Sequence, residues 1–263
     1  MTPKTKPESE STVFFSKGMI AVIVGIVIIL VALLAICMMQ PTPQATPQVT
    51  PKVTPQATPQ ATNAPVKSAR PMADLYVMSF CPYGTQAETG MGPVVDLLKS
   101  KADIRIRYIT TISGTTADSV DSLHGPAEAN EDLRQICINK YYPDQFWSYI
   151  KIFDEQCYPL WHNATVLESC QKNTTATLSL DSAKIDTCAT GTEGITLLKA
   201  DETAAGKDGA TASPMLFING VLYSGARTPD AYKQAICNSF ETVPAECSTV
   251  LSSASTATSG GCG

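Results

Sequence analysis

The alternation of apolar and polar positions predicts a strand, a helix and a second strand early in the globular part of the chain. Residues 73–80 form a nearly continuous apolar run, which is typical of a buried strand. A helix is expected over residues 82–100, because Pro82 suits the first helical position, with a kink or break at Gly92-Pro93. Residues 104–110 alternate with the period of two that indicates a strand. Together they make a βαβ unit with a right-handed crossover.

A mostly helical stretch follows, and the pattern then returns to strands. Helical spacing of apolar residues predicts an insertion of several helices over about residues 112–206. Two short apolar runs flank Asn219-Gly220, which is a strong signal for a β-hairpin. Thr228, an N-cap residue followed by Pro229, opens a last helix. The order βαβ, helical insertion, ββα predicts one α/β domain over residues 71–249.

A long apolar run precedes this domain. Residues 19–39 carry no charge, and a helix of that length spans about 30 Å, the thickness of a bilayer core. We expect an uncleaved transmembrane helix at residues 18–40, since no small-residue cleavage site follows it and bulky Ile36 disfavours lipoprotein processing at Cys37. Basic residues precede the span, which predicts a cytoplasmic tail at residues 1–17 and the remainder outside.

Two segments lack apolar periodicity. Residues 41–70 repeat Thr-Pro with Gln, Ala or Val between, a composition that forms no core and extends as polyproline II. This segment is expected to be a linker. Residues 250–263 are rich in Ser, Thr and Gly, which predicts a flexible tail that contains Cys262.

Composition narrows the class of protein. The net charge of the 263 residues is −5 and no basic stripe is present, so nucleic acid is not an expected partner. Of the 9 cysteines, only Cys37 falls in the apolar span, and the density of the others favours an oxidising compartment. We therefore expect a single-pass protein of the cell membrane with its C-terminal domain outside.

Cys81-Pro82-Tyr83-Gly84 lies at the junction of the first predicted strand and helix. A helix N-terminus stabilises an anion, so this position favours the thiolate of Cys81, the nucleophile of disulfide exchange, over a merely buried cysteine. Gly84 stands where a C-x-x-C pair has its second cysteine, so release of a mixed disulfide needs another thiol. A second substrate thiol, a small-molecule thiol and Cys262 are the candidates. The alternative for Cys262 is a structural pairing with Cys247.

The six remaining cysteines of the domain are expected to form structural disulfides. Cys237 and Cys247 bracket a short loop and are expected to pair. The insertion leaves three connectivities open for Cys137, Cys157, Cys170 and Cys188. Zinc is disfavoured, because these cysteines are far apart in sequence and only His124 and His162 are available. No metal or other cofactor is expected, and no cluster of Lys, Asp and Glu indicates acid–base chemistry.

Two motifs together resemble the DsbA-like branch of the thioredoxin superfamily, in its membrane-anchored archaeal and bacterial forms. They are Phe80-Cys81-Pro82-Tyr83-Gly84 and the run from Ala212 to Gly220, followed by Tyr223-Ser224-Gly225. The resemblance implies a thioredoxin-like fold in which Pro214 is cis and packs beside the active cysteine. It also implies that Pro82 and Tyr83 shape the catalytic site and that the backbone of Ser213 pairs with an incoming peptide. The monothiol motif departs from the family's pattern.

These observations predict a membrane-anchored, extracytoplasmic thiol–disulfide oxidoreductase in which the Cys81 thiolate attacks protein disulfides. Its expected partners are cysteine-containing secreted or membrane proteins, with a small-molecule thiol or a redox protein as electron partner. The alternative is a redox-inactive thioredoxin-fold module that binds peptides or acts like a chaperone, since fold does not determine function. Ligation of an iron–sulfur cluster by Cys81 is disfavoured by the oxidising compartment.

Overall fold

The computed structural model describes residues 65–254 and 260–263. The predicted cytoplasmic tail, the predicted transmembrane helix and most of the predicted linker therefore lie outside the described residues. Within the described residues, no helix combines the length and the apolar character that crossing a bilayer requires.

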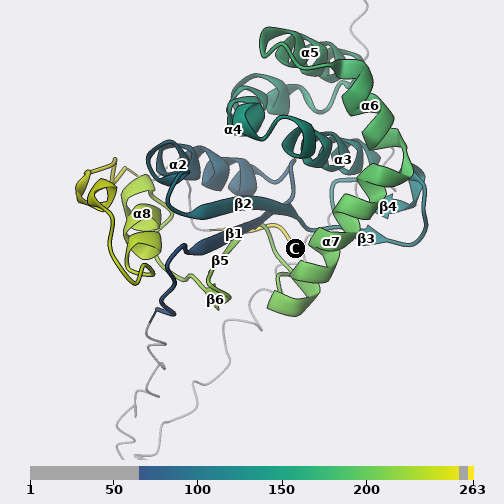
Figure 1. Cartoon of the computed structure of the whole chain (residues 1–263). Coiled ribbons are helices and arrows are strands. Elements are labelled where there is room, and N and C mark those ends of the chain that lie inside the picture. Colours follow the sequence, from purple (N-terminus) through teal and green to yellow (C-terminus); the bar gives the residue numbers. More distant parts are fainter. Residues whose placement is uncertain (1–64, 255–259) are drawn as a thin grey trace, which may run out of the picture. The chain divides into compact units, whose positions relative to one another are not determined.

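A four-stranded sheet organises the domain (Figure 1). Its order is β2 (Asp103–Tyr108), β1 (Met72–Val77), β5 (Met215–Ile218) and β6 (Val221–Leu222). Strand β1 pairs in parallel with β2, to which α2 (Pro82–Leu98) connects it, and antiparallel with β5. The predicted βαβ unit and the returning ββα unit are therefore both present, and they share one sheet.

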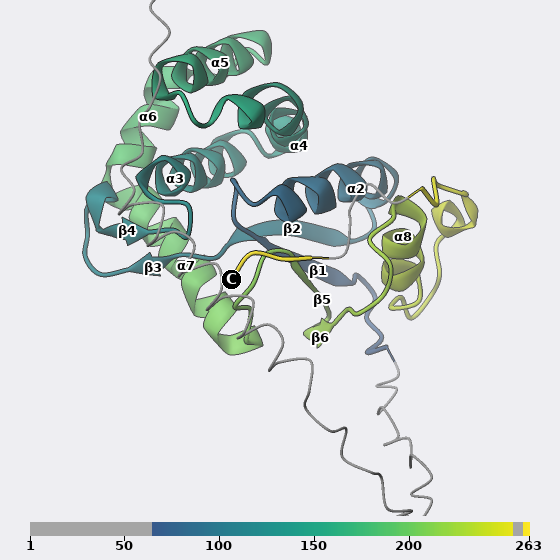
Figure 2. The same ribbon diagram turned by 180° about the vertical axis from the view of Figure 1, so that it is seen from behind.

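Alternate residues of β1 face two different apolar layers, as the pleat of a strand requires. Ala73, Leu75 and Val77 are fully buried in the main core, which α2 and α8 (Pro229–Cys237) also line. Tyr76 points to a smaller cluster on the other face, with Phe217 and residues at the end of α7 (Thr192–Asp208). Figure 2 shows α2 and α7 on opposite sides of the sheet. Burial of both faces explains the continuous apolar run in the sequence of β1.

The insertion is helical, as predicted, but a small hairpin precedes its helices. Strands β3 (Thr111–Ile112) and β4 (Val120–Asp121) pair antiparallel around the 3₁₀ turn Ala117–Ser119. Strands of two residues have no detectable period, so the sequence pattern could not reveal them. The helices are α3 (Pro126–Tyr141), α4 (Pro143–Ile152), α5 (Ala164–Thr177), α6 (Ser182–Thr190) and α7, with π-helical and 3₁₀ turns at Phe153–Cys157 and Tyr158–Leu160. In Figure 1, α4 and α5 lie beyond α2, on the side of the sheet opposite α7.

Three disulfides link neighbouring elements away from the sheet edge. Cys137 of α3 is bonded to Cys188 of α6, and Cys157 is bonded to Cys170 of α5. These two bonds choose one of the three connectivities that the sequence left open. Cys237, the last residue of α8, is bonded to Cys247 in the 3₁₀ turn Ala245–Ser248, which is the pair that their spacing predicted.

The predicted hairpin and last helix have the expected local geometry. Asn219 and Gly220 have φ values of 49° and 78°, the two positive angles of a type I′ turn. The side chain of Thr228 accepts a hydrogen bond from the Ala231 N–H, and Pro229 follows it as the first helical residue. Of the kink or break predicted at Gly92-Pro93, the break is absent, since α2 is continuous through Pro93. Buried apolar residues on both sides of this proline hold the helix against the core.

The domain is longer at both ends than predicted. Ser68, placed in the linker by its composition, exchanges two backbone hydrogen bonds with Ser239 and Glu241. The predicted flexible tail begins with ordered contacts, because the Leu251 N–H donates to Asp230 and the Ser252 carbonyl accepts the Asp230 N–H. Residues 260–263 also lie against the domain, and they belong to the site described next.

Candidate redox site

Cys81 lies at the N-terminus of α2, and residues 78–80 separate it from the end of β1. It is the N-cap residue, with extended backbone angles, and Pro82 occupies the first helical turn. The Cys81 N–H donates to the Met78 carbonyl at 2.9 Å, and the Cys81 carbonyl accepts the Thr85 N–H at 3.0 Å. The unpaired N–H groups and the dipole of this helix end favour negative charge on the sulfur of Cys81.

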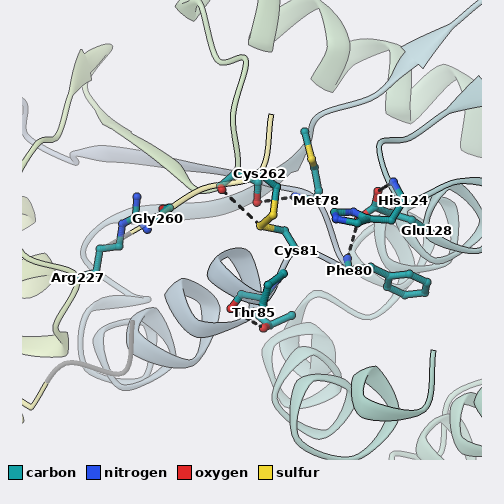
Figure 3. Close-up of a disulfide and its surroundings, with 11 residues drawn as sticks. Met78, Phe80, Cys81, Thr85, His124, Glu128, Arg227, Gly260 and Cys262 are labelled. Carbon is teal, nitrogen blue, oxygen red and sulfur yellow. Dashed lines mark hydrogen bonds and ion pairs between the residues drawn. A yellow bond between two sulfur atoms is a disulfide. The ribbon is translucent and has the colours of Figure 1, made fainter. Parts of the chain in front are cut away.

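A disulfide joins Cys81 to Cys262 across 181 residues of sequence, with a Cα–Cα distance of 6.1 Å (Figure 3). The alternative pairing of Cys262 with Cys247 is therefore wrong. In this oxidised form Cys81 is fully buried, whereas Cys262 is partly exposed. The segment that carries Cys262 thus covers the sulfur of Cys81.

The Ser213–Pro214 loop lies beside this disulfide, and its peptide bond is cis. Ser213 and Cys262 form an antiparallel bridge, in which each backbone N–H donates to the other's carbonyl at 2.7 and 2.8 Å. The Cys81 sulfur is 3.5 Å from the Ser213 carbonyl oxygen. The Ser213 hydroxyl also accepts the Met78 N–H at 2.9 Å, which ties the loop to the end of β1. The structure therefore brings together Cys81, Pro82, Tyr83, Ser213, Pro214 and Cys262.

Gly84 is required by the close approach of this loop. A Cβ atom at position 84 would lie 2.7 Å from the Ser213 hydroxyl oxygen and 3.1 Å from the Met78 carbonyl oxygen. Both contacts are closer than carbon and oxygen ordinarily approach. The place of a second C-x-x-C cysteine is therefore filled by Ser213, and the distant Cys262 pairs with Cys81 instead.

Two alanine substitutions in α2 should have opposite effects on stability. Gly84→Ala is expected to lower the free energy of unfolding by about 1–3 kcal/mol, because the added methyl group overpacks the contact with Ser213. Gly92→Ala is the matched control, since nothing lies within 4 Å of its Cβ position, and it should stabilise by about 0.5–1 kcal/mol. Urea unfolding measures both values. Equal effects at the two positions would contradict the crowding of Gly84.

His124 and Glu128 support the residue before Cys81, and sequence analysis assigned no role to them. Glu128 is fully buried, and its carboxylate accepts the Phe80 N–H at 2.8 Å and the His124 N–H at 3.0 Å. The His124 ring contacts the same carboxylate and packs against Trp161, which in turn contacts Phe80. The one sequence signal was a glutamate in the first turn of α3, where such side chains reach back to backbone N–H groups.

The structure gathers a group of carboxylates, three of them buried and Asp154 partly buried, that the sequence did not predict. Glu88 of α2, Glu131 and Asp132 of α3, and Asp154 after α4 come from distant parts of the chain. Burial raises the pKa of Glu88 well above its usual range, and the negative charge of Asp132 raises it further. Burial likewise raises the pKa of Glu131 to about 7, although hydrogen bonds from Gln135, Tyr149 and Gln171 act to lower it. The grouping joins residues far apart in sequence, so no pattern along the chain indicated it.

Stability should depend on pH through Glu131. Its pKa rises from 4.5 to about 7 on folding, so between these values the folded chain keeps a proton that the unfolded chain has lost. The contribution of Glu131 to the free energy of unfolding is therefore largest below pH 4.5 and falls by about 3 kcal/mol as the pH rises to 7. Glu131→Gln should flatten this fall in urea titrations across the range, whereas Glu241→Gln, at an exposed position, should not. Parallel curves for all three proteins would disprove the assignment.

No metal site accompanies these residues. Within residues 65–254 and 260–263, no group of three or more His, Cys, Asp and Glu side chains could hold a metal ion. The four insertion cysteines considered for zinc are instead engaged in two disulfides.

The sheet order, the cysteine at the start of α2 and the adjacent cis-proline loop define a thioredoxin-like protein. The thioredoxin-like domain of vacuolar sorting receptors matches residues 106–237, just over half of the chain. The chain therefore belongs to this family of thioredoxin-like domains. The matched region begins after Cys81 and ends before Cys262.

The chain is also similar to solved structures. The chain is similar to MdbA, a thiol-disulfide oxidoreductase from Actinomyces oris, with a TM-score of 0.50 and 14% identity over 66% of this chain and 83% of that one. Reduced DsbG from Mycobacterium tuberculosis has a TM-score of 0.48 and 16% identity, over 70% of this chain and 88% of DsbG. Alpha-DsbA1 from Wolbachia pipientis has a TM-score of 0.46 and 14% identity, over 68% of this chain and 90% of alpha-DsbA1. No curated protein sequence matches the chain.

Proposed function

We propose that this protein is a thiol–disulfide oxidoreductase in which Cys81 and Cys262 are the working redox pair. The observation that carries the proposal is the disulfide between them, at a helix N-terminus and against the cis-proline loop. The other three disulfides link elements elsewhere in the domain. Because the helix end stabilises a thiolate on Cys81, this cysteine is both the better nucleophile and the better leaving group.

The reduced pair would reduce a substrate in two steps. The Cys81 thiolate attacks one sulfur of a substrate disulfide, and the other substrate sulfur leaves as a thiolate that takes up a proton. The Cys262 thiolate then attacks the Cys81 sulfur of the mixed disulfide, and the second substrate thiolate is released. The substrate gains two electrons and the pair loses two. The reverse sequence oxidises a substrate dithiol.

Burial decides which sulfur of the oxidised pair an outside thiol reaches. Cys81 has an exposed fraction of 0%, whereas Cys262 is partly exposed. An incoming thiolate would therefore attack the Cys262 sulfur, and Cys81 would leave as the stabilised thiolate. Cys262 receives electrons from outside, and Cys81 reacts with the substrate once the covering segment has moved.

We also propose that the domain acts outside the cytoplasm, on secreted or membrane proteins that contain cysteine, from an anchor in the cell membrane. The four disulfides support an oxidising compartment, and the apolar residues 19–39 support the anchor. Protease added to intact cells should digest residues 65–263 while leaving cytoplasmic proteins whole. Protection of the domain until the cells are lysed would place it on the other side.

The redox pair is tested by equilibrating the full chain in glutathione buffers of graded potential, quenching with acid, alkylating the free thiols and mapping disulfides by mass spectrometry. The Cys81–Cys262 bond is expected to open at a more oxidising potential than the other three, because stabilisation of the Cys81 thiolate favours the reduced form. The other disulfides of the same molecule are the controls. A Cys81–Cys262 bond that never forms, or that resists reduction as long as Cys137–Cys188, would refute the proposal.

A further inference from the structure

The segment Gly260-Gly261-Cys262-Gly263 lies against the domain, and Cys262 forms an isolated antiparallel bridge with Ser213. Two backbone hydrogen bonds join Cys262 to Ser213, and the guanidinium of Arg227 donates to the Gly260 carbonyl at 2.5 Å (Figure 3). All three contacts involve the backbone of the segment. They hold an extended chain of any sequence, with its cysteine aimed at Cys81.

At the three glycines of the segment, by contrast, atoms of the domain occupy the space that a side chain would need. A Cβ atom at 260 would lie 2.5 Å from the Tyr83 ring carbon Cζ. One at 261 would lie 3.1 Å from the Ser213 carbonyl oxygen, and one at 263 would lie 2.6 Å from the Thr211 carbonyl oxygen.

We propose that Ser213, Arg227 and Tyr83 form a peptide-binding groove that selects an extended peptide whose cysteine is flanked by glycine on both sides. The segment Gly260–Gly263 is the internal occupant of this groove and shows its footprint. This inference rests on the proposed function, because the bound peptide's sulfur must react with Cys81. The substrate class is accordingly a Gly-Gly-Cys-Gly stretch, or one equally bare, in a protein or peptide disulfide.

The three glycine positions differ in how strictly they are selected. The groups that exclude a side chain next to the cysteine are backbone atoms of residues 211–213, which cannot move without disturbing the start of β5. Two residues before the cysteine, a side chain is excluded by the partly exposed ring of Tyr83, which can turn away. Selection for glycine is therefore strict beside the cysteine and weaker two residues before it.

Synthetic peptides test the groove with the full-length Cys262→Ser variant, whose reduced Cys81 is the only thiol of the pair. Each peptide carries its cysteine as a mixed disulfide with thionitrobenzoate. The Cys81 thiolate attacks the peptide sulfur, the Cys81–peptide disulfide forms, and thionitrobenzoate leaves as a coloured anion. The peptides are Ala-Gly-Gly-Cys-Gly-Ala and three variants with leucine before, after or two residues before the cysteine. Rates are divided by those of glutathione with the same peptide, which removes differences in intrinsic reactivity.

The peptide Ala-Gly-Gly-Cys-Gly-Ala is expected to react at least about 10-fold faster than either peptide with leucine beside the cysteine. Tyr83→Ala should restore the rate of the peptide with leucine two residues before the cysteine, and of no other. Arg227→Gln should slow every peptide about 10-fold, because it removes a charged donor to the backbone, while Arg70→Gln, at an exposed arginine elsewhere, should slow none.

The outcomes separate the groove from the chemistry. Equal normalised rates for all peptides, or faster reaction with leucine, would overturn the groove while Cys81-dependent exchange stands. If the Cys262→Ser variant reacted with no peptide faster than the variant that also carries Cys81→Ser, both the groove and the proposed function would be overturned. If the chain's own C-terminal segment still occupies the groove in the Cys262→Ser variant, it slows all peptides alike, so the ratios between peptides are unchanged.

Discussion

Cys81→Ser is expected to abolish disulfide exchange, lowering the rate of insulin reduction by more than about 10³-fold. The hydroxyl of serine is not ionised at neutral pH, and no other cysteine of the described residues lies at a helix N-terminus beside the cis-proline loop. The fall should appear equally in the assay with a protein disulfide and in the assay with a mixed-disulfide peptide, because both begin with attack by the same sulfur.

The matched control is the double variant Cys237→Ala/Cys247→Ala, which also loses one disulfide but away from the site. It is expected to be less stable by about 2–4 kcal/mol and to keep its exchange rate below its unfolding temperature. If Cys81→Ser instead reduced insulin as fast as the parent, the chain would be a peptide-binding module on a thioredoxin-like fold.

Cys262→Ser is expected to separate the two halves of the reaction. Cys81 still attacks the substrate, so a mixed disulfide accumulates to one equivalent per chain, but the second product is not released. In a single turnover of the pre-reduced chain, release of the second substrate thiol should slow at least about 10²-fold relative to the parent, and it should recover when millimolar glutathione supplies the resolving thiol. Acid quenching, alkylation and mass spectrometry measure the trapped species, and the release of substrate thiol measures turnover.

Accessibility gives an independent readout of the same variant. In the oxidised parent Cys81 is buried and bonded, so iodoacetamide should not modify it. In Cys262→Ser the free Cys81 thiolate should be modified within minutes at neutral pH. Release of both substrate thiols by pre-reduced Cys262→Ser, in the absence of any added thiol, would show that another group of the chain resolves the mixed disulfide.

Most of the fold could be predicted because its signals are local. Strand β1, predicted over residues 73–80 and observed at Met72–Val77, the proline at the start of α2 and the Asn219-Gly220 turn each depend on a few neighbouring residues. The insertion was recognised as helical for the same reason. The two-residue strands β3 and β4 escaped, because a strand that short has no period.

The site was predictable only in part. The position of Cys81 at the start of a helix could be predicted, because it follows from the order of the neighbouring strand and helix. The placement of Ser213 and Pro214 beside it was inferred from a resemblance and not from the residues. The filling of the second cysteine's place by the Ser213 hydroxyl depends on a distance of 2.7 Å between two segments far apart in sequence. No pattern along the chain contains such a distance.

The sequence by itself determined the order of elements, the thiolate-favouring position of Cys81 and the absence of a second cysteine at Gly84, since these are properties of neighbouring residues. Only the tertiary structure decided that Cys262, 181 residues away, is the partner of Cys81, and that Glu88, Glu131 and Asp154 share one buried region. The physical reason is that pairing and burial depend on which distant segments the sheet and helices bring into contact. Chain-local propensities hold no information on that contact.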